Sequence, residues 1–344
     1  MAGGGGTRLW PASRRKRPKQ FLPILPGGQT LLGATVARLL PLVPAERILV
    51  VTARSQVGEV ERCVPEIPKA NIVVEPIGRN TAPCIGLAAV DVMGRDPNGI
   101  MAVVPSDQYV TDADTYRQSV ARAIAVASSG DICTIGIPAR TPETGFGYLE
   151  RGDQAANGAY ALTRFVEKPD AKTAQDYVAS GRFVWNSGMF FFAAERILSE
   201  IDRHMPALGK ILSEIRKNRG ETDRLYPDAP SESIDYGVME KLPAGQVFVE
   251  LGDFGWNDVG SWSAIGEIRN SDENGNVPTG ETVTVDAQNN ILYAGEGRVI
   301  AAVGVSDLII VAEGDAVLIM PRSRAQDVRE IVKALEKTKR ETYL

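Results

Sequence analysis

The sequence predicts an α/β fold with a mixed, mainly parallel sheet flanked by helices, followed by a smaller β-rich domain. Two observations indicate this organisation. Short apolar runs alternate with helical stretches through the first half, which is typical of a sheet buried between helix layers. After residue 272 the chain changes to closely spaced β runs separated by Gly, Asn and Asp turns.

Apolar runs of strand length recur along the first 250 residues, with helical patterns between them. The expected strands are Ile48–Val51, Ile72–Val74, Met101–Val104, Ile132–Ile135, Phe165–Glu167, Met189–Phe192 and Val247–Glu250. The expected helices are Leu31–Leu40, Ala82–Met93, Tyr116–Ala127, Lys172–Ser180 and Glu195–Arg216, the last with a break at Pro206. Ligands of such sheets bind at the carboxyl ends of the strands, so polar residues directly after a strand are candidate site residues.

The C-terminal part is expected to form its own domain over residues 273–344, after a larger domain over residues 1–272. Its expected strands are Thr282–Val285, Ile291–Tyr293, Val299–Val303, Leu308–Val311 and Val317–Met320. A terminal helix is predicted to open at the capping-box pattern Ser323–Gln326. One face of that helix, expected to pack on the β strands or on a partner subunit, carries Val328, Ile331, Val332 and Leu335.

The composition argues against several classes of protein and of site. The chain has 344 residues, of which 44% are hydrophobic and 24% charged, and a formal net charge of −5, as in an ordinary globular protein. No run approaches a transmembrane span and no signal-peptide pattern opens the chain, so a cytoplasmic location is expected. Its three cysteines are unclustered, and His204 is its single histidine. Disulfide frameworks, His-rich metal sites and histidine-dependent nucleophilic catalysis are therefore not expected.

A glycine-rich and strongly basic segment opens the chain. Four glycines occupy positions 3–6, six Arg and Lys residues follow between Arg8 and Lys19, and the first acidic residue is Glu46. Consecutive glycines let backbone N–H groups converge on an anion, and a local cation cluster on an acidic protein indicates a focused anion site. Apolar residues interleaved with the charges, such as Trp10 and Phe21, argue against a disordered tail.

The glycine segment fits neither of the two commonest nucleotide loops. A phosphate-binding loop of the Walker A type requires Gly-Lys followed by Ser or Thr, whereas this chain has Gly6-Thr7-Arg8. The dinucleotide-binding fingerprint would require a glycine at position 8, which is Arg8. A P-loop ATPase and a Rossmann dehydrogenase are therefore not supported.

The motif Gly-Gly-x-Gly-Thr-Arg-Leu followed by Pro18-Lys19 resembles the sugar-phosphate nucleotidyltransferases. Within them, Leu9–Arg14 with Pro18–Phe21 resembles the mannose-1-phosphate guanylyltransferases. Further segments similar to that family follow in order, namely Glu75–Pro83, Pro105–Asp107, Gly145–Tyr148, Phe165–Pro169, Trp185–Phe190, Ser233–Tyr236 and Trp256–Trp262. Each segment alone is weak evidence, but eight in the correct order over most of the chain are strong evidence.

The resemblance implies a Rossmann-like nucleotidyltransferase fold with a left-handed β-helix-like C-terminal domain used for self-association. It implies transfer of GMP from GTP to mannose 1-phosphate, giving GDP-mannose and pyrophosphate. A homodimer is expected, without nucleic-acid or membrane partners. The sequence ends too soon for the phosphomannose isomerase domain that some relatives carry, so a monofunctional enzyme is expected.

The resemblance also implies which residues bind the nucleotide. The glycine loop with Arg8 and Lys19 would hold the triphosphate, and the Glu75–Thr81 loop would recognise guanine. The expected nucleotide-binding residues are Gly3, Gly4, Gly6, Thr7, Arg8, Lys19, Glu75, Arg79, Asn80 and Thr81. At the start of a helical run, Asn80 and Thr81 could equally be plain N-caps.

Asp107 and Asp258 are the expected ligands of Mg²⁺, because carboxylate oxygens are hard ligands suited to this ion. Each aspartate taken alone could equally be a turn cap. One position departs from the family pattern, which often has His after the first Asp, whereas this chain has Gln108. We expect Gln108 to affect the orientation of the ligand and to leave the ligand itself in place.

The resemblance assigns the sugar end of the site to a third group of residues. Lys168 would hold the sugar phosphate and Glu167 the sugar hydroxyls, although a plain surface ion pair is the alternative. The remaining expected sugar-binding residues are Gly145, Gly147, Asn186 and Asp235. The expected catalytic residues are Arg8, Lys19, Asp107, Lys168 and Asp258.

Two other functions stay open at this point. The chain could use another sugar 1-phosphate or another nucleoside triphosphate, or it could be a regulatory homologue that binds a nucleotide sugar without turnover. A phosphate loop of this kind should follow a buried strand, yet only Met1 and Ala2 precede Gly3. We therefore expect the first central strand of the sheet to be missing from this chain.

Overall fold

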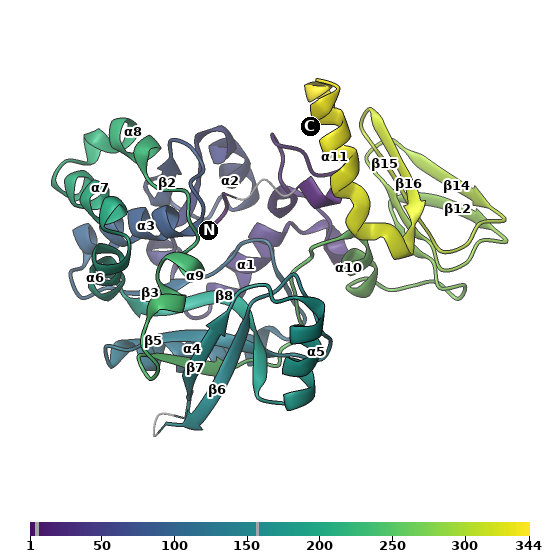
Figure 1. Ribbon diagram of the computed structural model, residues 1–344. Helices are drawn as coiled ribbons and strands as arrows, with labels where there is room; N and C mark the ends of the chain where they lie inside the picture. The colour runs from purple at the N-terminus through teal and green to yellow at the C-terminus, as the bar shows by residue number, and fades with distance from the viewer. Residues whose placement is uncertain (4–6, 156–157) are drawn as a thin grey trace.

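A six-stranded mixed sheet between two layers of helices forms the larger part of the molecule (Figure 1). The computed structural model describes residues 1–3, 7–155 and 158–344. The strand order is β3-β8-β5-β9-β7-β6. The strands are β3 (Ile100–Val103), β5 (Ile132–Pro138), β6 (Tyr148–Gln154), β7 (Tyr160–Val166), β8 (Phe183–Ala193) and β9 (Val247–Leu251).

The hydrogen-bond registers confirm that this sheet is mixed. Strands β3 and β5 both run antiparallel to β8, and β5 runs parallel to β9, so β3, β5 and β9 point the same way. Their carboxyl ends therefore meet at one edge of the sheet, and the loop after β3 carries Asp107. A short antiparallel pair between β4 (Tyr109–Val110) and β10 (Trp256–Asn257) brings a late segment of the chain beside that loop.

Strand β8 shows how the sheet separates two hydrophobic cores. Its residues alternate between the two faces, so Phe190 and Phe192 enter one core while Met189 and Phe191 enter the other. Helices α3, α6 and α7 cover the first face, and α1 and α4 cover the second (Figure 1). The helices of this part are α1 (Leu31–Leu39), α2 (Val57–Cys63), α3 (Thr81–Arg95), α4 (Ala113–Ser128), α5 (Ala171–Ser180), α6 (Ala194–His204), α7 (Pro206–Lys217), α8 (Thr222–Leu225), α9 (Ile234–Gly237) and α10 (Trp262–Glu267).

Residues 1–3 lie between the six-stranded sheet and a separate parallel pair formed by β1 (Val50–Ala53) and β2 (Ile72–Glu75). The Ala2 N–H donates to the Val51 carbonyl at 2.8 Å, and the Met1 amino group donates to the Val104 carbonyl at 2.9 Å. These bonds place Gly3 and the start of the glycine segment next to the ends of β1 and β3. Residues Gly4 and Gly6 of the predicted phosphate loop lie outside the described residues.

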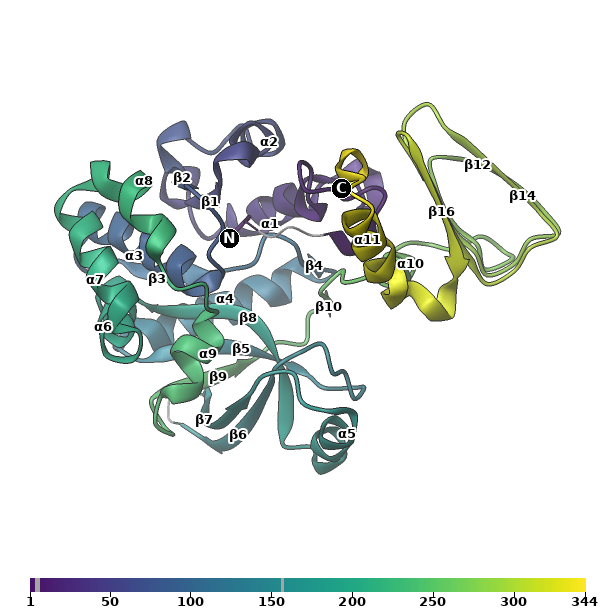
Figure 2. The same ribbon diagram turned by 45° about the horizontal axis from the view of Figure 1, so that its top comes forward.

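The C-terminal strands form a β-helix-like domain, seen end-on at the side of the molecule in Figure 2. Parallel pairs β11–β13, β13–β15 and β12–β14 stack successive turns of chain, and β16 closes the stack in antiparallel fashion. A buried asparagine ladder joins the turns, because Asn276 Oδ1 accepts from the Asn290 N–H and Asn290 Oδ1 from the Leu308 N–H. The strands are β11 (Val277–Thr279), β12 (Glu281–Val285), β13 (Ile291–Ala294), β14 (Val299–Val303), β15 (Leu308–Glu313) and β16 (Ala316–Pro321).

The predicted start of the terminal helix is wrong. Helix α11 (Val328–Lys337) begins after a 3₁₀ segment over Arg322–Asp327, so the capping-box pattern lies in that segment and does not cap the helix. Val328 and Val332 are buried as expected, whereas Ile331 is 41% exposed. All three residues lie within α11, where successive side chains are about 100° apart, so Ile331 lies at the edge of the face that Val328 and Val332 bury. None of the helices in the described part of the chain combines the length and apolar composition that a membrane crossing requires.

The C-terminal domain packs directly on the N-terminal basic segment. Leu9 and Trp10 share one hydrophobic core with Trp262, Ile309 and Val328. Hydrogen bonds reinforce the contact, because the Trp262 indole N–H donates to the Trp10 carbonyl at 3.0 Å and the Trp10 indole N–H donates to the Tyr343 carbonyl at 2.7 Å. The segment that carries Arg8 and Lys19 is therefore held in place by residues from the far end of the chain.

We expect Trp262→Phe to destabilise the protein by about 1–3 kcal/mol, because it leaves the buried Trp10 carbonyl without its donor. Chemical denaturation measures the change in the free energy of unfolding. Tyr343→Phe is the matched control, since the Tyr343 contact uses the backbone carbonyl and not the hydroxyl group. Equal stability of Trp262→Phe and the wild type would show that this bond does not hold the segment.

Candidate active site

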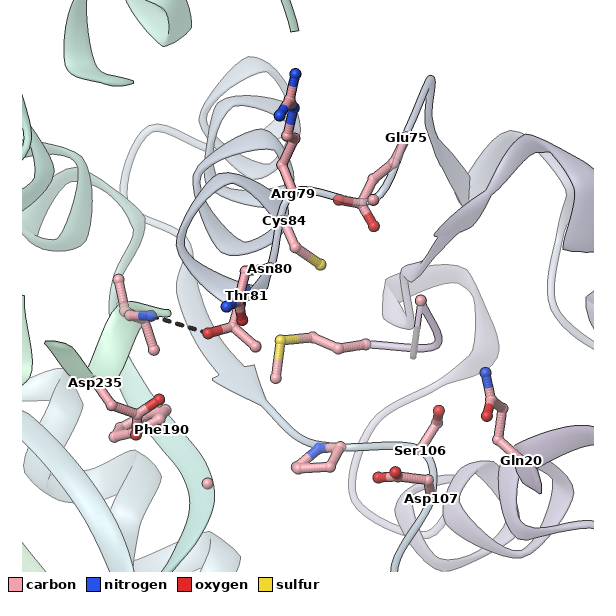
Figure 3. Close-up of a pocket in the computed structure, with 16 residues that line it drawn as sticks. Gln20, Glu75, Arg79, Asn80, Thr81, Cys84, Ser106, Asp107, Phe190 and Asp235 are labelled. Carbon is pink, nitrogen blue, oxygen red and sulfur yellow. Dashed lines mark hydrogen bonds between the residues drawn. The ribbon is translucent and has the colours of Figure 1, made fainter. Parts of the chain in front are cut away.

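A pocket of about 270 Å³ opens at the carboxyl end of β3, between the start of α3 and the short helix α9 (Figure 3). Several predicted site residues line it: Gly3, Glu75, Arg79, Asn80, Thr81, Asp107 and Asp235. They come from the first residues of the chain, the loop between β2 and α3, the loop after β3, and α9. The structure thus gathers residues from the predicted nucleotide, metal and sugar groups around one cavity.

Lys19 joins the two predicted metal ligands. Its side chain is only 11% exposed, and its Nζ lies 3.1 Å from Asp107 Oδ2. The same Nζ donates to the Asp258 carbonyl at 2.8 Å and to the Val259 carbonyl at 3.3 Å. A single ammonium group therefore fixes the loop after β3 against the turn after β10.

The Asp258 carboxyl lies in a cluster of opposing charges. Burial raises its pKa above the usual range, while the nearby positive charges of Lys19 and Arg8 oppose the rise. The Asp107 charge acts in the same direction as burial. A Cβ at Gly260 would lie 2.5 Å from Asp258 Oδ2, so only glycine leaves room for this carboxylate.

Glu75 is a buried carboxylic acid on the pocket wall, with only 2% of its surface exposed. The Tyr226 hydroxyl donates to its Oε1. Burial raises the pKa of the Glu75 carboxyl, and the hydrogen bond from Tyr226 opposes this rise. Gly3 lies against the other oxygen, because a Cβ at Gly3 would be 3.0 Å from Glu75 Oε2. Arg79, from the same loop, donates to the Pro227 carbonyl.

Asn80 and Thr81 are both helix-start residues and pocket residues. Asn80 caps α3 with a positive φ of 69°, and its Oδ1 accepts from the Thr81 N–H at 2.8 Å. Thr81 Oγ1 accepts from the Ile234 N–H at 2.9 Å, the dashed bond in Figure 3. This bond connects the start of α3 to the start of α9, where Asp235 lies.

Asp235, Asn186 and Glu167 form the opposite end of the site. The Asn186 side-chain amide donates to Asp235 Oδ1 at 2.9 Å. A Cβ at Gly147 would lie 2.4 Å from Glu167 Oε2 and 3.3 Å from the Asn186 Cβ, so the glycine is needed for this packing. Burial raises the pKa of Asp235 to about 6, and the charge of Glu167 contributes to the rise.

The other predicted residues lie at the edges of this arrangement. Lys168 adopts a positive φ of 43°, and its half-exposed ammonium pairs with Glu167 Oε1. Arg8 is exposed within the 3₁₀ turn Thr7–Leu9, close enough to Asp258 to influence its pKa. Gly145 lies on an exposed loop with open space around it, so the structure does not bring it to the pocket.

Several residues of the site could not be predicted from the sequence. Tyr226 supports Glu75, Glu240 accepts a hydrogen bond from the Glu167 backbone, and Gln20 and Phe190 line the pocket. Gln20 follows Lys19 directly, so the motif itself was the available signal. Tyr226 lies in an irregular stretch of short turns, far along the chain from its partner, and the sequence contains no pattern that links the two.

The chain matches two families of known domains. Residues 1–275 match the family described as "Nucleotidyl transferase", and residues 280–335 match the "MannoseP isomerase/GMP-like beta-helix domain". The chain belongs to the nucleotidyl transferase family. It is therefore a nucleotidyltransferase with a β-helix-like C-terminal domain, as the resemblance implied.

Bacterial relatives extend over nearly the whole chain. A protein named "Xanthan biosynthesis protein XanB" from Xanthomonas campestris pv. campestris (strain B100) is 41% identical over 98% of this chain and 72% of its own length. The mannose-1-phosphate guanylyltransferase of Escherichia coli (strain K12) is 39% identical over 98% of this chain and 72% of its own length. A putative enzyme of the same name from Vibrio cholerae is 38% identical, covering 100% of this chain and 75% of its own length.

Solved structures agree with the nucleotidyltransferase fold. A crystal structure from Thermus thermophilus, described as a mannose-1-phosphate geranyltransferase, superposes with a TM-score of 0.89 at 38% sequence identity and covers 98% of both chains. A Helicobacter pylori structure described as a mannose-6-phosphate isomerase has a TM-score of 0.58 at 25% identity, covering 70% of this chain and 95% of its own. The fold class is thus confirmed.

We expect Asp235→Asn to change how the stability of this nucleotidyltransferase depends on pH. The folded-state pKa of about 6 exceeds the value of about 3.9 for an unfolded aspartate, so the folded protein binds more protons between these values. Stability is therefore lost as the pH rises through this window. The variant should match the wild type near pH 4 and be more stable by about 1–3 kcal/mol at pH 7, as measured by chemical denaturation.

Asp170→Asn supplies a control of opposite sign. Asp170 caps α5, and hydrogen bonds from Thr173 lower the pKa of its exposed carboxyl. Removing this charge should reduce stability at neutral pH and leave it unchanged in acid. If Asp235→Asn also lost stability at pH 7, the account of its burial would be wrong.

Proposed function

We propose that this nucleotidyltransferase transfers GMP from GTP to mannose 1-phosphate, forming GDP-mannose and pyrophosphate. The observation that carries the proposal is the Lys19 bridge between Asp107 and the Asp258 turn, at a pocket with the Glu75–Thr81 loop at one end and the Asn186–Asp235 pair at the other. The names of relatives at 38–39% identity support the choice of substrates.

The chemistry requires positive charge and alignment more than acid–base catalysis. A phosphate oxygen of mannose 1-phosphate attacks the α-phosphorus of GTP, and the bond to the bridging oxygen of pyrophosphate breaks. The nucleophile is already ionised at neutral pH, so no side chain has to remove a proton. Arg8 and Lys19 would stabilise the charge that accumulates on the triphosphate as pyrophosphate leaves.

Asp107 and Asp258 fit the requirements of a Mg²⁺ site. Mg²⁺ is usually bound by one or two protein carboxylates and completes its shell with water and substrate phosphates. The described residues contain no group of three or more His, Cys, Asp or Glu that could hold a metal ion. The bound ion would neutralise phosphate charge and hold both substrates in line. Lys19 would keep Asp107 oriented toward Asp258.

The two ends of the pocket would distinguish the two substrates. Glu75, Arg79, Asn80 and Thr81 would recognise the guanine base, for which the buried Glu75 carboxyl offers hydrogen-bond acceptors. The sugar would lie beside Asn186, Asp235 and Glu167, with Gly147 on the adjoining loop and Lys168 on its phosphate. Gly3, Gly4, Gly6 and Thr7 would bind the triphosphate through backbone N–H groups.

The substrate proposal is tested by pyrophosphate release from four nucleoside triphosphates paired with several sugar 1-phosphates. We expect GTP with mannose 1-phosphate to give the highest kcat/KM. Preference for another pair would indicate a different transferase, and GDP-mannose binding without turnover would indicate a regulatory homologue.

Asp107→Asn should reduce kcat/KM by about 10²–10³-fold, because a neutral amide binds Mg²⁺ weakly. Asp253→Asn, at an exposed acid that pairs with Arg140, is the matched control and should keep wild-type activity. Full activity of Asp107→Asn at low Mg²⁺ concentration would rule out the metal role.

We further propose that the two domains divide between residues 272 and 273, that the enzyme acts in the cytoplasm on its nucleotide substrates, and that the C-terminal domain forms a homodimer.

An exposed outer face of β12 and β14 supports the dimer. It carries four aliphatic side chains that are 52–67% exposed, Val283, Val285, Val299 and Val303. An apolar face of this kind on a β-helix is suited to a second copy of the same surface.

Val303→Glu should shift the protein toward monomer in size-exclusion chromatography with light scattering, because it places a charge in the proposed interface. Leu42→Glu, at an exposed leucine of the catalytic domain, is the control and should leave the assembly unchanged. A monomeric wild type, or an unaltered dimer in Val303→Glu, would contradict the interface.

A further inference from the structure

Gln108 occupies a buried position between three parts of the site. It follows Asp107 directly and is only 8% exposed. Its Nε2 donates to the Ser187 carbonyl at 2.7 Å, and its Oε1 accepts from the Trp256 indole N–H at 2.9 Å. Both ends of the amide are therefore used, each by a different segment of the chain.

Each of these partners adjoins a site residue. Ser187 follows Asn186, whose amide holds Asp235 at the sugar end of the pocket. Trp256 lies two residues before Asp258, in the strand β10 that pairs with β4 directly after Gln108. The Gln108 side chain thus connects three segments: its own loop, which carries Asp107, the strand β10 before the Asp258 turn, and strand β8, which carries Asn186.

The backbone of Gln108 is held as firmly as its side chain. The guanidinium group of Arg38, itself only 8% exposed, donates to the Gln108 carbonyl at 3.3 Å and to Thr35 Oγ1 at 3.0 Å. No carboxylate pairs with Arg38 among the residues that the structure describes. Its contacts run instead to this carbonyl, to Thr35 and to the ring of Tyr116. A buried cation thus fixes the residue next to Asp107.

We propose that Gln108 is a positioning residue of the transferase reaction, which holds the Asp107 loop, the Asp258 turn and the sugar-binding strand in one arrangement. The proposal rests on the proposed function, because it assigns Asp107 and Asp258 to the metal. The amide suits this position because it offers a donor and an acceptor at its tip. An apolar side chain would leave the Ser187 carbonyl and the Trp256 N–H without these partners in a buried site.

The test compares Gln108→Met, which keeps the length of the side chain and removes both bonds, with the wild type. We expect the Mg²⁺ concentration for half-maximal rate and the KM for mannose 1-phosphate to rise about 10–100-fold, as for other residues that orient metal ligands. The affinity for GTP measured without metal should stay within about twofold, since Gln108 does not touch the Glu75–Thr81 loop. Equal loss of all three quantities would indicate general destabilisation and overturn the proposal, as would wild-type kinetics.

Three further variants make the result specific. Trp256→Phe removes the indole donor and keeps an aromatic ring against Phe146 and Trp185, and should show a smaller loss. It carries the same test if Gln108→Met does not fold. The double variant that combines Gln108→Met with Trp256→Phe has no indole N–H left unpaired. Its loss in the kinetic quantities above should therefore be smaller than the product of the two single losses.

Gln108→His is assayed at pH 8, where imidazole is neutral and has one donor and one acceptor. This variant should keep most of the activity. Multiplicative losses in the double variant, or Gln108→His as impaired as Gln108→Met, would overturn the proposal.

A readout without catalysis separates this proposal from the proposed function. The indole N–H resonance of Trp256, identified by its loss in Trp256→Phe, should shift in Gln108→Met and stay in place in Gln118→Met, a control at an exposed position on α4. A wild type that releases no pyrophosphate, together with this shift, would refute the function and leave the positioning contact standing. An unshifted resonance would refute the positioning contact.

Discussion

The buried ammonium group of Lys19 is the contact on which the rest of the site depends. It brings together the N-terminal basic segment, the loop after β3 and the turn after β10, which are separated by up to 240 residues. Burying an ammonium group is costly unless it is paired, and here a carboxylate and two carbonyls surround it. The same requirement fixes Asp107 and Asp258 near one another, so charge balance and the geometry of the site have one cause.

Local patterns were sufficient to predict most of the elements. Strands such as Ile132–Ile135 and the break at Pro206 follow from short apolar runs and from proline chemistry, which act within a few residues. The start of the last helix was predicted wrongly, because the Ser323–Gln326 pattern also fits a 3₁₀ turn. Packing of Val328 against the domain decides between the two, and such packing cannot be read from the local sequence.

The site could be predicted as far as its residues belong to contiguous motifs. The structure places Asp107 and Asp235 in one pocket and leaves Gly145 outside it. The position of Gly145 could not be predicted, because a motif does not show which side of a loop faces the cavity. The contribution of Tyr226 to Glu75, and of Trp256 to Gln108, depends on long-range contacts between irregular segments. Hydrogen bonds of this kind have no periodicity, so only the folded chain reveals them.

The asparagine ladder of the C-terminal domain has a consequence for how such domains can change in length. Asn276 and Asn290 repeat the same hydrogen bond at successive turns, so each coil meets its neighbour through an identical joint. A coil inserted between two such joints would extend the domain along its axis, as in other solenoids. The face that shares a core with Trp10 carries Val277, Ile291 and Ile309, one from each successive turn, so an added coil would lengthen this face as well. The fold thereby couples the length of the C-terminal domain to the surface that supports the N-terminal segment.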